Sequence, residues 1–288
     1  MTLVFALVRF SGDPVALMAD PYMTDADIAN LKSNFGLDDP IGVQYVKYVR
    51  NMATGDFGQS VRFREPAFNL YRERLPATLK LVAVATVISA IVAIPIGLAA
   101  GIRPGGTVDR FAKTLALVGQ SIPSFWLGIL LIIVFAVQFS LLPTSGDRQG
   151  LKSMVLPGLT MSTFAIAALV RVTRSSVLDI KDAEFVALLR AKGLPSSVVV
   201  WRQELKNARL PILALASLQI IGFLSGSVIV EQFAWPGVGR LAVESVYSRD
   251  FPVIQTVVVV NTTLLVVINL LVDLSYALID PRVRLAGA

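Results

Sequence analysis

Long apolar runs separated by short polar intervals fill the chain after residue 75. The runs cover residues 76–102, 111–142, 156–172, 210–230 and 253–279, and a helix of about 20 apolar residues is long enough to cross a bilayer. A further apolar run at residues 1–10 has about half that length, so we expect a truncated first transmembrane helix there. The pattern predicts an all-α, polytopic membrane protein with about six transmembrane helices.

Proline and glycine residues predict where these runs bend. Pro95 and Gly97 stand near the end of the first long run, and proline removes a backbone hydrogen bond from a helix. The run of residues 111–142 is too long for one straight crossing, and residues 120–123, with the sequence QSIP, predict a break near its first third. We therefore expect kinked or broken helices in this region.

Residues 11–75 are polar and mixed in composition, with several Gly-Asp and Asp-Pro turn signals. They predict a compact extramembrane loop. Within it, residues 25–35 and 43–52 have the apolar spacing of short amphipathic helices. Residues 231–250 predict a second extramembrane loop, and residues 76–288 as a whole predict the transmembrane domain.

Residues 173–209 predict a basic loop that carries a helical hairpin between two spans. Glu184 adds negative charge to the first turn of the first helix. Gly193 followed by Pro195 predicts the end of that helix after Lys192. The loop therefore presents a capped, amphipathic helix at a membrane surface.

Ser196 is a suitable cap for a second helix of the hairpin. Apolar and basic residues of that helix fall on different faces at spacings of three and four. The apolar face has Val198, Trp201 and Leu205, and the basic face has Arg202, Lys206 and Arg209.

Basic residues concentrate in one set of connections, and cytoplasmic loops carry such an excess of lysine and arginine. The interval that contains the hairpin has Arg171, Arg174, Lys181, Arg190, Lys192, Arg202, Lys206 and Arg209, and the C-terminus adds Arg282 and Arg284. The rule places the hairpin and the C-terminus in the cytoplasm. Residues 11–75 then lie outside, as a loop long enough to be translocated regardless of its charge.

The composition supports the membrane class and excludes much chemistry. The chain is 55% hydrophobic and only 16% charged, with a mean hydropathy of +0.68. It has no cysteine and no histidine, so disulfides, thiol nucleophiles, histidine catalysis and the usual zinc sites are excluded. We predict no catalytic residue, no metal site and, despite the net charge of +6, no nucleic-acid partner.

The sequence contains no GxxxxGK[ST] phosphate loop. If nucleotide energy is used, another subunit binds the nucleotide, and this chain binds no cofactor. Asp273 is the carboxylate that lies within a predicted span, and such residues mark ion-coupled carriers. Its place near the cytoplasmic end favours a structural ion pair, but an ion-coupled secondary transporter that uses Asp273 stays open as an alternative.

Polar residues inside the spans are candidates for a translocation path. Gln120, Ser121, Gln219 and Ser225 stand beside kinks and small residues, where polar groups border cavities. Most such residues instead hold helices together by hydrogen bonds. The hairpin also has two interpretations, as a surface helix pair on anionic headgroups or as a docking site for a partner. The small residues Ala187 and Ala191 favour docking.

Several motifs together resemble the permease subunits of ATP-binding-cassette importers, in the dipeptide/oligopeptide/nickel branch. The resemblance extends from about Gly12 to Arg284. It rests on Arg190-Ala191-Lys192-Gly193 with Asn207-Ala208 and Leu210-Pro211, on Phe125-Trp126-Leu127-Gly128, on Trp235-Pro236-Gly237 before Arg240, on Arg249-Asp250-Phe251-Pro252, and on Asp273 with Asp280-Pro281-Arg282.

The resemblance implies the type I importer permease fold, with a cytoplasmic coupling hairpin, in a bacterial cytoplasmic (inner) membrane. It implies a homologous second permease, two cytoplasmic ATPase subunits or one fused pair that bind ATP and Mg, and an extracytoplasmic solute-binding protein. ATPase coupling is implied for Glu184, Ala187, Arg190, Ala191, Lys192, Gly193, Asn207 and Pro211. At Leu188 and Leu189 the family usually has smaller residues, so a bulkier docking face is expected.

The substrate stays open at this point. Di- and oligopeptides are the main expectation from the resemblance, and nickel chelates, glutathione and other small solutes use the same scaffold. A membrane scaffold that docks cytoplasmic partners without moving a solute is a third class of function, beside the importer and the secondary transporter.

Overall fold

The computed structural model describes residues 38–146, 149–181, 183–195, 199, 205–233 and 235–279, together with Thr2, Phe5, Ala6, Thr24 and Ala26. Over this part of the chain the regular elements are helices, apart from one isolated bridge between Gln59 and Pro66. The all-α prediction is therefore confirmed for the described residues. The chain divides into two compact units, a first unit of Met1–Pro76 with Gly237–Val266 and a second unit of Ala77–Pro236 with Val267–Ala288.

The first unit contains α3 (Ile41–Ala53), the start of α4 (Ala67–Ile102), α11 (Val238–Tyr247) and the start of α12 (Phe251–Ile279). Helix α3 confirms the short helix predicted at residues 43–52, whereas the one predicted at residues 25–35 lies mostly outside the described residues. Helix α11 lies within residues 231–250, for which the sequence predicted a loop without an assigned helix. The buried residues Val238, Leu241 and Ser245 of α11 share one face at helical spacing. The polar residues between them make this buried face hard to recognise in the sequence.

A buried carboxylate organises the loops of the first unit. The side chain of Asp250 accepts a hydrogen bond from the Ser60 hydroxyl and another from the Arg62 backbone N–H at 3.2 Å. The Ser60 hydroxyl oxygen also accepts the Phe63 N–H at 2.9 Å. Arg249, directly before Asp250, has a φ of 53°. The Arg249-Asp250 motif thus turns the chain into α12 and holds the loop before α4 against it.

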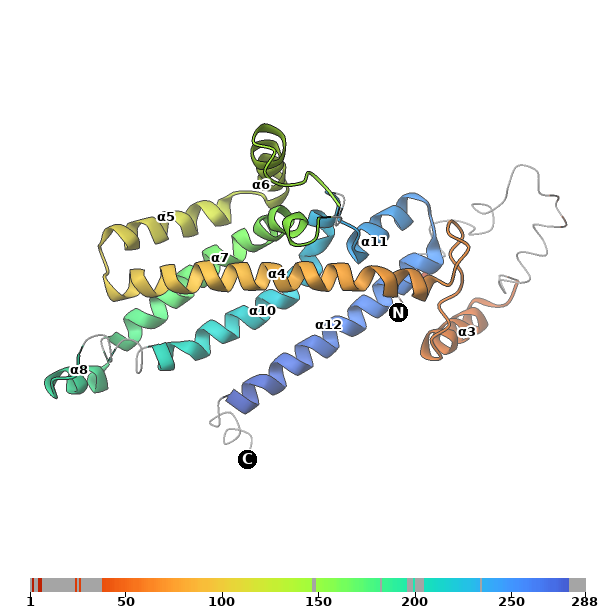
Figure 1. The fold of residues 1–288 in the computed structure, drawn as a ribbon. Coiled ribbons are helices and arrows are strands. Elements are labelled where there is room, and N and C mark those ends of the chain that lie inside the picture. The colour runs from red at the N-terminus through yellow and green to blue at the C-terminus, as the bar shows by residue number, and fades with distance from the viewer. Residues whose placement is uncertain are drawn as a thin grey trace, which may run out of the picture. The chain divides into compact units, whose positions relative to one another are not determined.

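The second unit is built around α7 (Leu151–Lys181). This helix contacts α5 (Thr107–Ser121), α6 (Ser124–Leu131) and α10 (Leu205–Glu231), and Figure 1 shows α5, α7 and α10 side by side. Its buried residues, which include Ile166, Leu169, Val170 and Val177, join Ala93, Leu98, Ala112 and Ile212 in one apolar cluster. Because α7 is covered from several sides, it is the central helix of this unit.

Helix α4 approaches α7 closely at two of its glycines. A Cβ at Gly97 would lie 2.6 Å from the Cβ of Thr173, and one at Gly101 would lie 2.7 Å from the Cβ of Val177. Helix α4 is unbroken at Pro95 and Gly97, where the sequence predicted kink points. Gly97 allows two helix backbones to approach, a use of small residues that is common between membrane helices.

The predicted break at residues 120–123 is confirmed. Helix α5 ends at Ser121, α6 begins at Ser124, and the pair bends by 104°. Ile122 has extended backbone angles, with ψ at 122°, as expected for a residue before proline. Helix α6 continues as the π-helical segment η1 (Ile132–Gln138). A local rule about proline therefore accounts for the sharpest turn in the unit.

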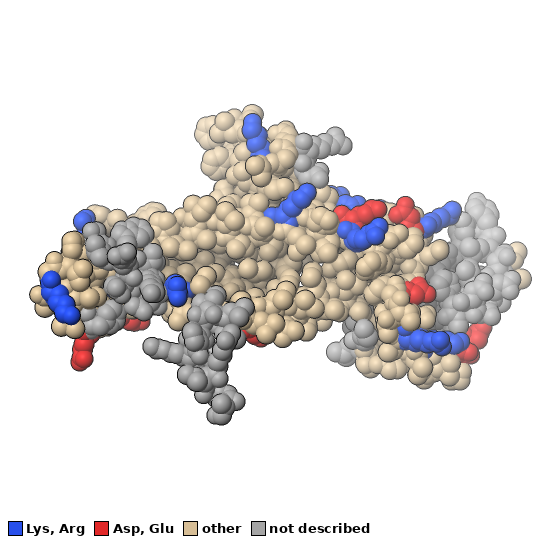
Figure 2. Space-filling view, turned by 60° about the horizontal axis from the view of Figure 1, so that its bottom comes forward, with Lys and Arg blue, Asp and Glu red and all other residues tan. Residues whose placement is uncertain are grey.

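Four helices are long and apolar enough to cross a membrane, or five if the bent pair forms one span, among the residues that the structure describes. Figure 2 shows wide areas of the surface without charged side chains. Several helices run beyond the apolar stretches: α4 begins at Ala67 rather than residue 76, α7 ends at Lys181 rather than 172, and α10 begins at Leu205 rather than 210. Helical hydrogen bonding continues where apolar composition stops, so these helices are longer than the apolar runs they contain.

Candidate functional site

The hairpin region begins with α8 (Glu184–Ala191), which follows α7 after a short turn. The Val186 N–H donates to the Ala183 carbonyl at 3.0 Å and opens the helix. At its end, the Leu194 N–H donates to the Leu189 carbonyl at 3.3 Å, and Gly193 has a φ of 78°. This is the left-handed glycine cap of a helix C-terminus. The predicted end of the first hairpin helix at Gly193 is confirmed.

Helix α8 has an exposed stripe and, on another side, a buried residue. Val186 is fully buried, whereas Glu184, Leu188 and Ala191, at spacings of four and three, are exposed. Leu188 has 56% of its surface exposed. Lys192 and Gly193 extend this exposed stripe, and a Cβ at Gly193 would meet nothing within 4 Å. The stripe therefore presents apolar and charged side chains together on the surface of this chain.

The remaining predicted coupling residues are placed only in part. Ala187 and Arg190 lie on α8 and Asn207 on the first turn of α10, but their side chains are outside the described residues. Pro211 is exposed within α10. The second hairpin helix is corrected by the structure, because Lys206 and Arg209 belong to α10 and not to a separate short helix. Its other predicted residues, from Ser196 to Glu204, lie outside the described residues except Val199.

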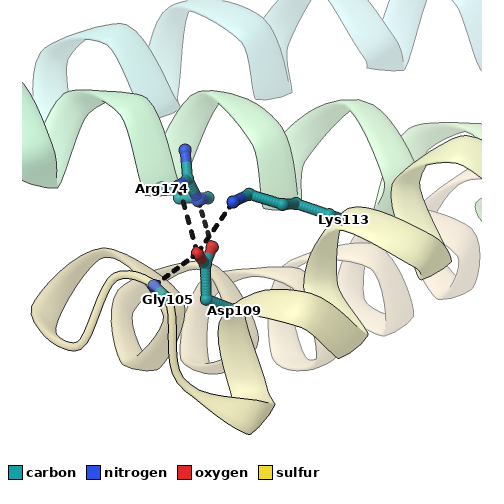
Figure 3. Close-up of polar contacts among 4 residues, drawn as sticks. All are labelled: Gly105, Asp109, Lys113 and Arg174. Atoms are coloured by element: carbon teal, nitrogen blue, oxygen red, sulfur yellow. Dashed lines mark hydrogen bonds and ion pairs between the residues drawn. The ribbon is translucent and has the colours of Figure 1, made fainter.

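Ionic contacts tie α7, the helix that leads into α8, to the first turn of α5. Figure 3 shows the contacts of the fully buried Asp109. Its carboxylate forms ion pairs with Arg174 of α7 and, at 2.9 Å, with Lys113 of α5. It also accepts a hydrogen bond of 2.8 Å from the Gly105 N–H. One guanidinium nitrogen of Arg174 forms a further contact of 3.3 Å. A carboxylate taken out of water needs such partners. Sequence reasoning missed this group, although the spacing of four between Asp109 and Lys113 was a signal.

A second contact joins α7 to the end of α4, nearer to α8. The ammonium group of Lys181, the last residue of α7, donates to the Ile102 carbonyl at 3.0 Å, and Ile102 is the last residue of α4. A cation at a helix end satisfies a carbonyl that has no partner within its helix. The end of α7 is therefore anchored at two levels, at Arg174 and at Lys181.

The predicted path residues Gln120 and Ser121 border a hollow between α5 and α7. The hollow measures about 800 Å³, including space open to the outside, and is lined by Lys113, Gln120, Ser121, Arg171 and Arg174 together with small and apolar residues. We call it the cationic hollow. In the sequence, Arg171 and Arg174 indicate only the orientation of the chain in the membrane.

Gln219 borders a different, more apolar hollow of about 910 Å³ that is lined from α6, α7 and α10. Its side-chain amide donates to the Ala165 carbonyl at 3.1 Å, as expected of a residue that joins two membrane helices. Ser225 is exposed on α10 and lines neither hollow. The four predicted path residues are thus divided between two hollows and a helix surface. We call the hollow at Gln219 the apolar hollow.

Asp273 is exposed on α12 and makes no ion pair with any residue that the structure describes. The residues of the Asp280-Pro281-Arg282 motif lie outside that part of the chain. The same described residues contain no group of three acidic side chains that could hold a metal ion.

These features define a multi-pass membrane subunit with an exposed helical segment anchored to its central helix. Residues 93–285 match the family model described as binding-protein-dependent transport system inner membrane component. The chain is 39% identical over 286 residues to the oligopeptide transport system permease protein AppB of Bacillus subtilis, covering 95% of this chain and 90% of that protein. It is 34% identical over 315 residues to the dipeptide transport system permease protein DppB of Escherichia coli, covering 98% and 93%.

The chain belongs to the family of binding-protein-dependent transport system inner membrane components. A chain of the MetNI methionine ABC transporter, solved in inward-facing conformations, matches with a TM-score of 0.64 at 19% identity, covering 75% of this chain and 99% of that chain. The fold is the type I ABC importer permease fold. The resemblance, the fold class and the role as a membrane permease subunit of a transport system are confirmed.

Proposed function

We propose that this chain is a pore-forming permease subunit of an ATP-driven importer of di- and oligopeptides. The observation that carries the proposal is its identity of 39% with an oligopeptide permease along 95% of the chain. A dipeptide permease and a probable peptide ABC transporter permease of Sinorhizobium fredii, which is 38% identical, agree with it. Peptide is therefore the substrate class that the relatives favour.

In this proposal the exposed stripe of α8 binds an ATPase subunit. Glu184, Ala191, Lys192 and Gly193 are exposed there, and Arg190 stands on the same helix. Closure of the ATPase on ATP and Mg moves α8, and α7 passes this displacement to the pore. The contacts of Lys181 with the end of α4 and of Arg174 with the first turn of α5 support such a transmission, since they make the end of α7 part of a larger body.

The complete transporter then contains a homologous second permease, two cytoplasmic ATPase subunits or one fused pair, and an extracytoplasmic solute-binding protein. The hairpin and the C-terminus face the cytoplasm, because basic residues gather there. Residues 11–75 face the outside. ATP hydrolysis belongs to the ATPase subunits, in agreement with a sequence that has no phosphate-binding loop.

One specific observation favours glutathione as a second candidate substrate. The glutathione transport system permease protein GsiC of Salmonella typhimurium is 38% identical over 284 residues, covering 98% of this chain. Glutathione is itself a modified tripeptide, so the same pore chemistry serves both candidates. Import of nickel chelates, transport driven by an ion at Asp273, and a scaffold without transport are weaker candidates because nothing in the described residues supports them.

The experiment is purification of this subunit in mild detergent with whatever associates with it, followed by ATPase and uptake assays in liposomes. We expect a second permease and an ATPase in the complex, and ATP hydrolysis stimulated by one binding protein loaded with peptide. Stimulation by glutathione alone replaces the peptide assignment with the second candidate. A lone chain that transports solute on an ion gradient, with loss of transport in Asp273→Asn, contradicts the importer.

A further inference from the structure

The cationic hollow has more positive charge than the residues that the structure describes neutralise. Lys113, Arg171 and Arg174 line it, and Asp109 is the carboxylate paired with two of them. Three cations against one carboxylate leave a surplus of two positive charges among the described residues. Protein groups of one sign around a hollow attract a ligand of the opposite sign.

Arg171 is the cation that is free to bind such a ligand. Arg174 and Lys113 are held by Asp109, whereas Arg171 is exposed and makes no ion pair with the part of the chain that the structure describes. A guanidinium group presents its N–H donors in a planar fork that matches both oxygens of a carboxylate. The neighbouring Arg174, which also lines the hollow, already holds the buried carboxylate of Asp109 through two of its nitrogens.

Two neutral polar residues complete the lining on the opposite helix. Gln120 and Ser121 stand at the end of α5, at the 104° bend. The Ser121 hydroxyl donates to the Leu117 carbonyl at 2.9 Å, which leaves its oxygen as an acceptor, and an amide side chain offers both a donor and an acceptor. Such groups fit a ligand that has hydrogen-bonding groups beside its charge, as a peptide backbone does.

The cationic hollow and the apolar hollow both border α7, at different heights along its axis. Ala165 lines the apolar hollow and Val170 the cationic one, and five residues correspond to about 7.5 Å along a helix. Phe164 and Arg171, seven residues apart, lie on one exposed face of α7. A solute that follows this face meets apolar side chains first and positive charge on the side toward Lys181 and α8.

We infer that the cationic hollow is a carboxylate site on the solute path, in which Arg171 binds the negatively charged carboxylate of the transported peptide. This inference rests on the proposed peptide import. It adds that the permease itself distinguishes a peptide with an ionised C-terminal carboxylate from a peptide with a neutral C-terminus. The phosphate of an anionic lipid is a different ligand for the same charges, and the path along α7 together with Gln120 and Ser121 favours the solute.

The test uses the complete transporter with its binding protein in proteoliposomes of neutral lipid. The probes are trialanine and trialanine amide, and uptake is measured per loaded binding protein, so that receptor preference does not enter. We expect Arg171→Gln to reduce trialanine uptake about tenfold, the effect of one lost charged hydrogen bond, and to leave trialanine amide unchanged. We expect Arg171→Lys to keep part of the preference for trialanine over its amide. Lys152→Gln, which removes an exposed cation elsewhere on α7, should change the uptake of neither peptide.

Three results overturn the inference. If Arg171→Gln lowers the uptake of trialanine and of trialanine amide equally, the residue supports transport without binding the carboxylate. If it changes neither probe, the hollow does not bind the solute. If the effect of Arg171→Gln appears only in liposomes with anionic lipid, the ligand is a lipid phosphate. Failure of the unaltered transporter to take up either probe instead contradicts the proposed peptide import, so the two failures are distinguishable.

Discussion

Two regions of the second unit use glycine for opposite purposes. In α4, Gly97 and Gly101 let the helix approach α7 so closely that a Cβ would lie within 3 Å of α7 side chains. At the end of α8, Gly193 has open space around it and a φ of 78°. The first region needs the missing volume of glycine, and the second needs its backbone freedom. The comparison separates a tightly packed contact from an open segment that ends an exposed helix.

The difference shows where each part of the subunit meets its surroundings. The glycine face of α4 is covered by side chains of α7 in the same chain. The Asp109 ion pairs and the Lys181 hydrogen bond continue these internal contacts toward α8. The exposed stripe of α8 has no such closure among the described residues. Substitutions in the packed region should therefore change the stability of the subunit, whereas substitutions in α8 should change its association with partners.

The largest effect is expected from Gly97→Leu. The new side chain would begin 2.6 Å from the Thr173 Cβ and 2.9 Å from the Val170 carbonyl oxygen, which is backbone and cannot move aside. We expect destabilisation by about 1–3 kcal/mol or more and little folded subunit in the membrane. The measurement is the yield of subunit that is monodisperse in detergent.

Ala99→Leu is the matched control, because Ala99 is exposed on the same helix. Leucine has a higher helix propensity than glycine by about 1 kcal/mol, so propensity alone predicts a gain for Gly97→Leu. Normal yield of Gly97→Leu would show that α4 does not pack on α7 as described.

The next effect is expected at the open glycine. Gly193→Trp places a large side chain in the space beside the exposed stripe of α8, and we expect uptake and co-purifying ATPase to be lost while the subunit stays in the membrane. Strain from the positive φ contributes about 1–2 kcal/mol in any variant with a side chain. Gly193→Asn, which tolerates this conformation, should retain more ATPase.

Gly55→Trp separates backbone strain from docking, because Gly55 has a φ of 82° and nothing within 4 Å of an added Cβ. We expect this variant to keep its ATPase subunits. Retention of the ATPase by Gly193→Trp would remove α8 from the coupling contact.

A smaller effect is expected from Asp109→Asn. The change leaves Arg174 without its carboxylate partner, and we expect a loss of about 1–3 kcal/mol and a lower melting temperature in detergent. Asp179→Asn, at an exposed position of α7, serves as the control and should have no effect. Equal melting temperatures of Asp109→Asn and the unaltered protein would show that the ion pair does not anchor α7.

The smallest effect is expected from Lys181→Met. It removes one hydrogen bond to the Ile102 carbonyl from a half-buried ammonium group, which is worth about 1 kcal/mol. The melting temperature should fall slightly, and less than in Asp109→Asn. Lys152→Met, at an exposed position near the other end of α7, is the control. A larger loss than in Asp109→Asn would reverse the order of the two anchors.

The sequence predicted best where one local rule decides the structure. The break before Pro123 and the end of α8 at Gly193 follow from the backbone limits of proline and glycine, and both are confirmed. The apolar pattern does not show how far each helix extends, since α4, α7 and α10 continue as helices past their apolar residues. Helix α11 was missed because its buried face is completed by residues that are distant in the sequence.

The candidate site divides in the same way. Glu184 and Ala191 lie on the exposed face of α8 at spacings that helical geometry fixes in advance. The path residues did not gather as one set, because Gln120 and Gln219 border different hollows. Which hollow a side chain borders depends on how helices cross, and a single sequence with many apolar faces does not determine that.

By itself the sequence determined the membrane class, the helical content, the break between α5 and α6 and the family, since composition, proline and short motifs act locally. Only the tertiary structure decided that Asp109 meets Arg174, 65 positions away along the chain, and that Lys113, Arg171 and Arg174 border one hollow. The sequence shows that these residues are charged, but the role of each charge depends on which residues lie next to it in the folded protein. Packing of α5 against α7 brings those neighbours together, and so turns residues that read as orientation signals into a buried ion pair and a cationic hollow.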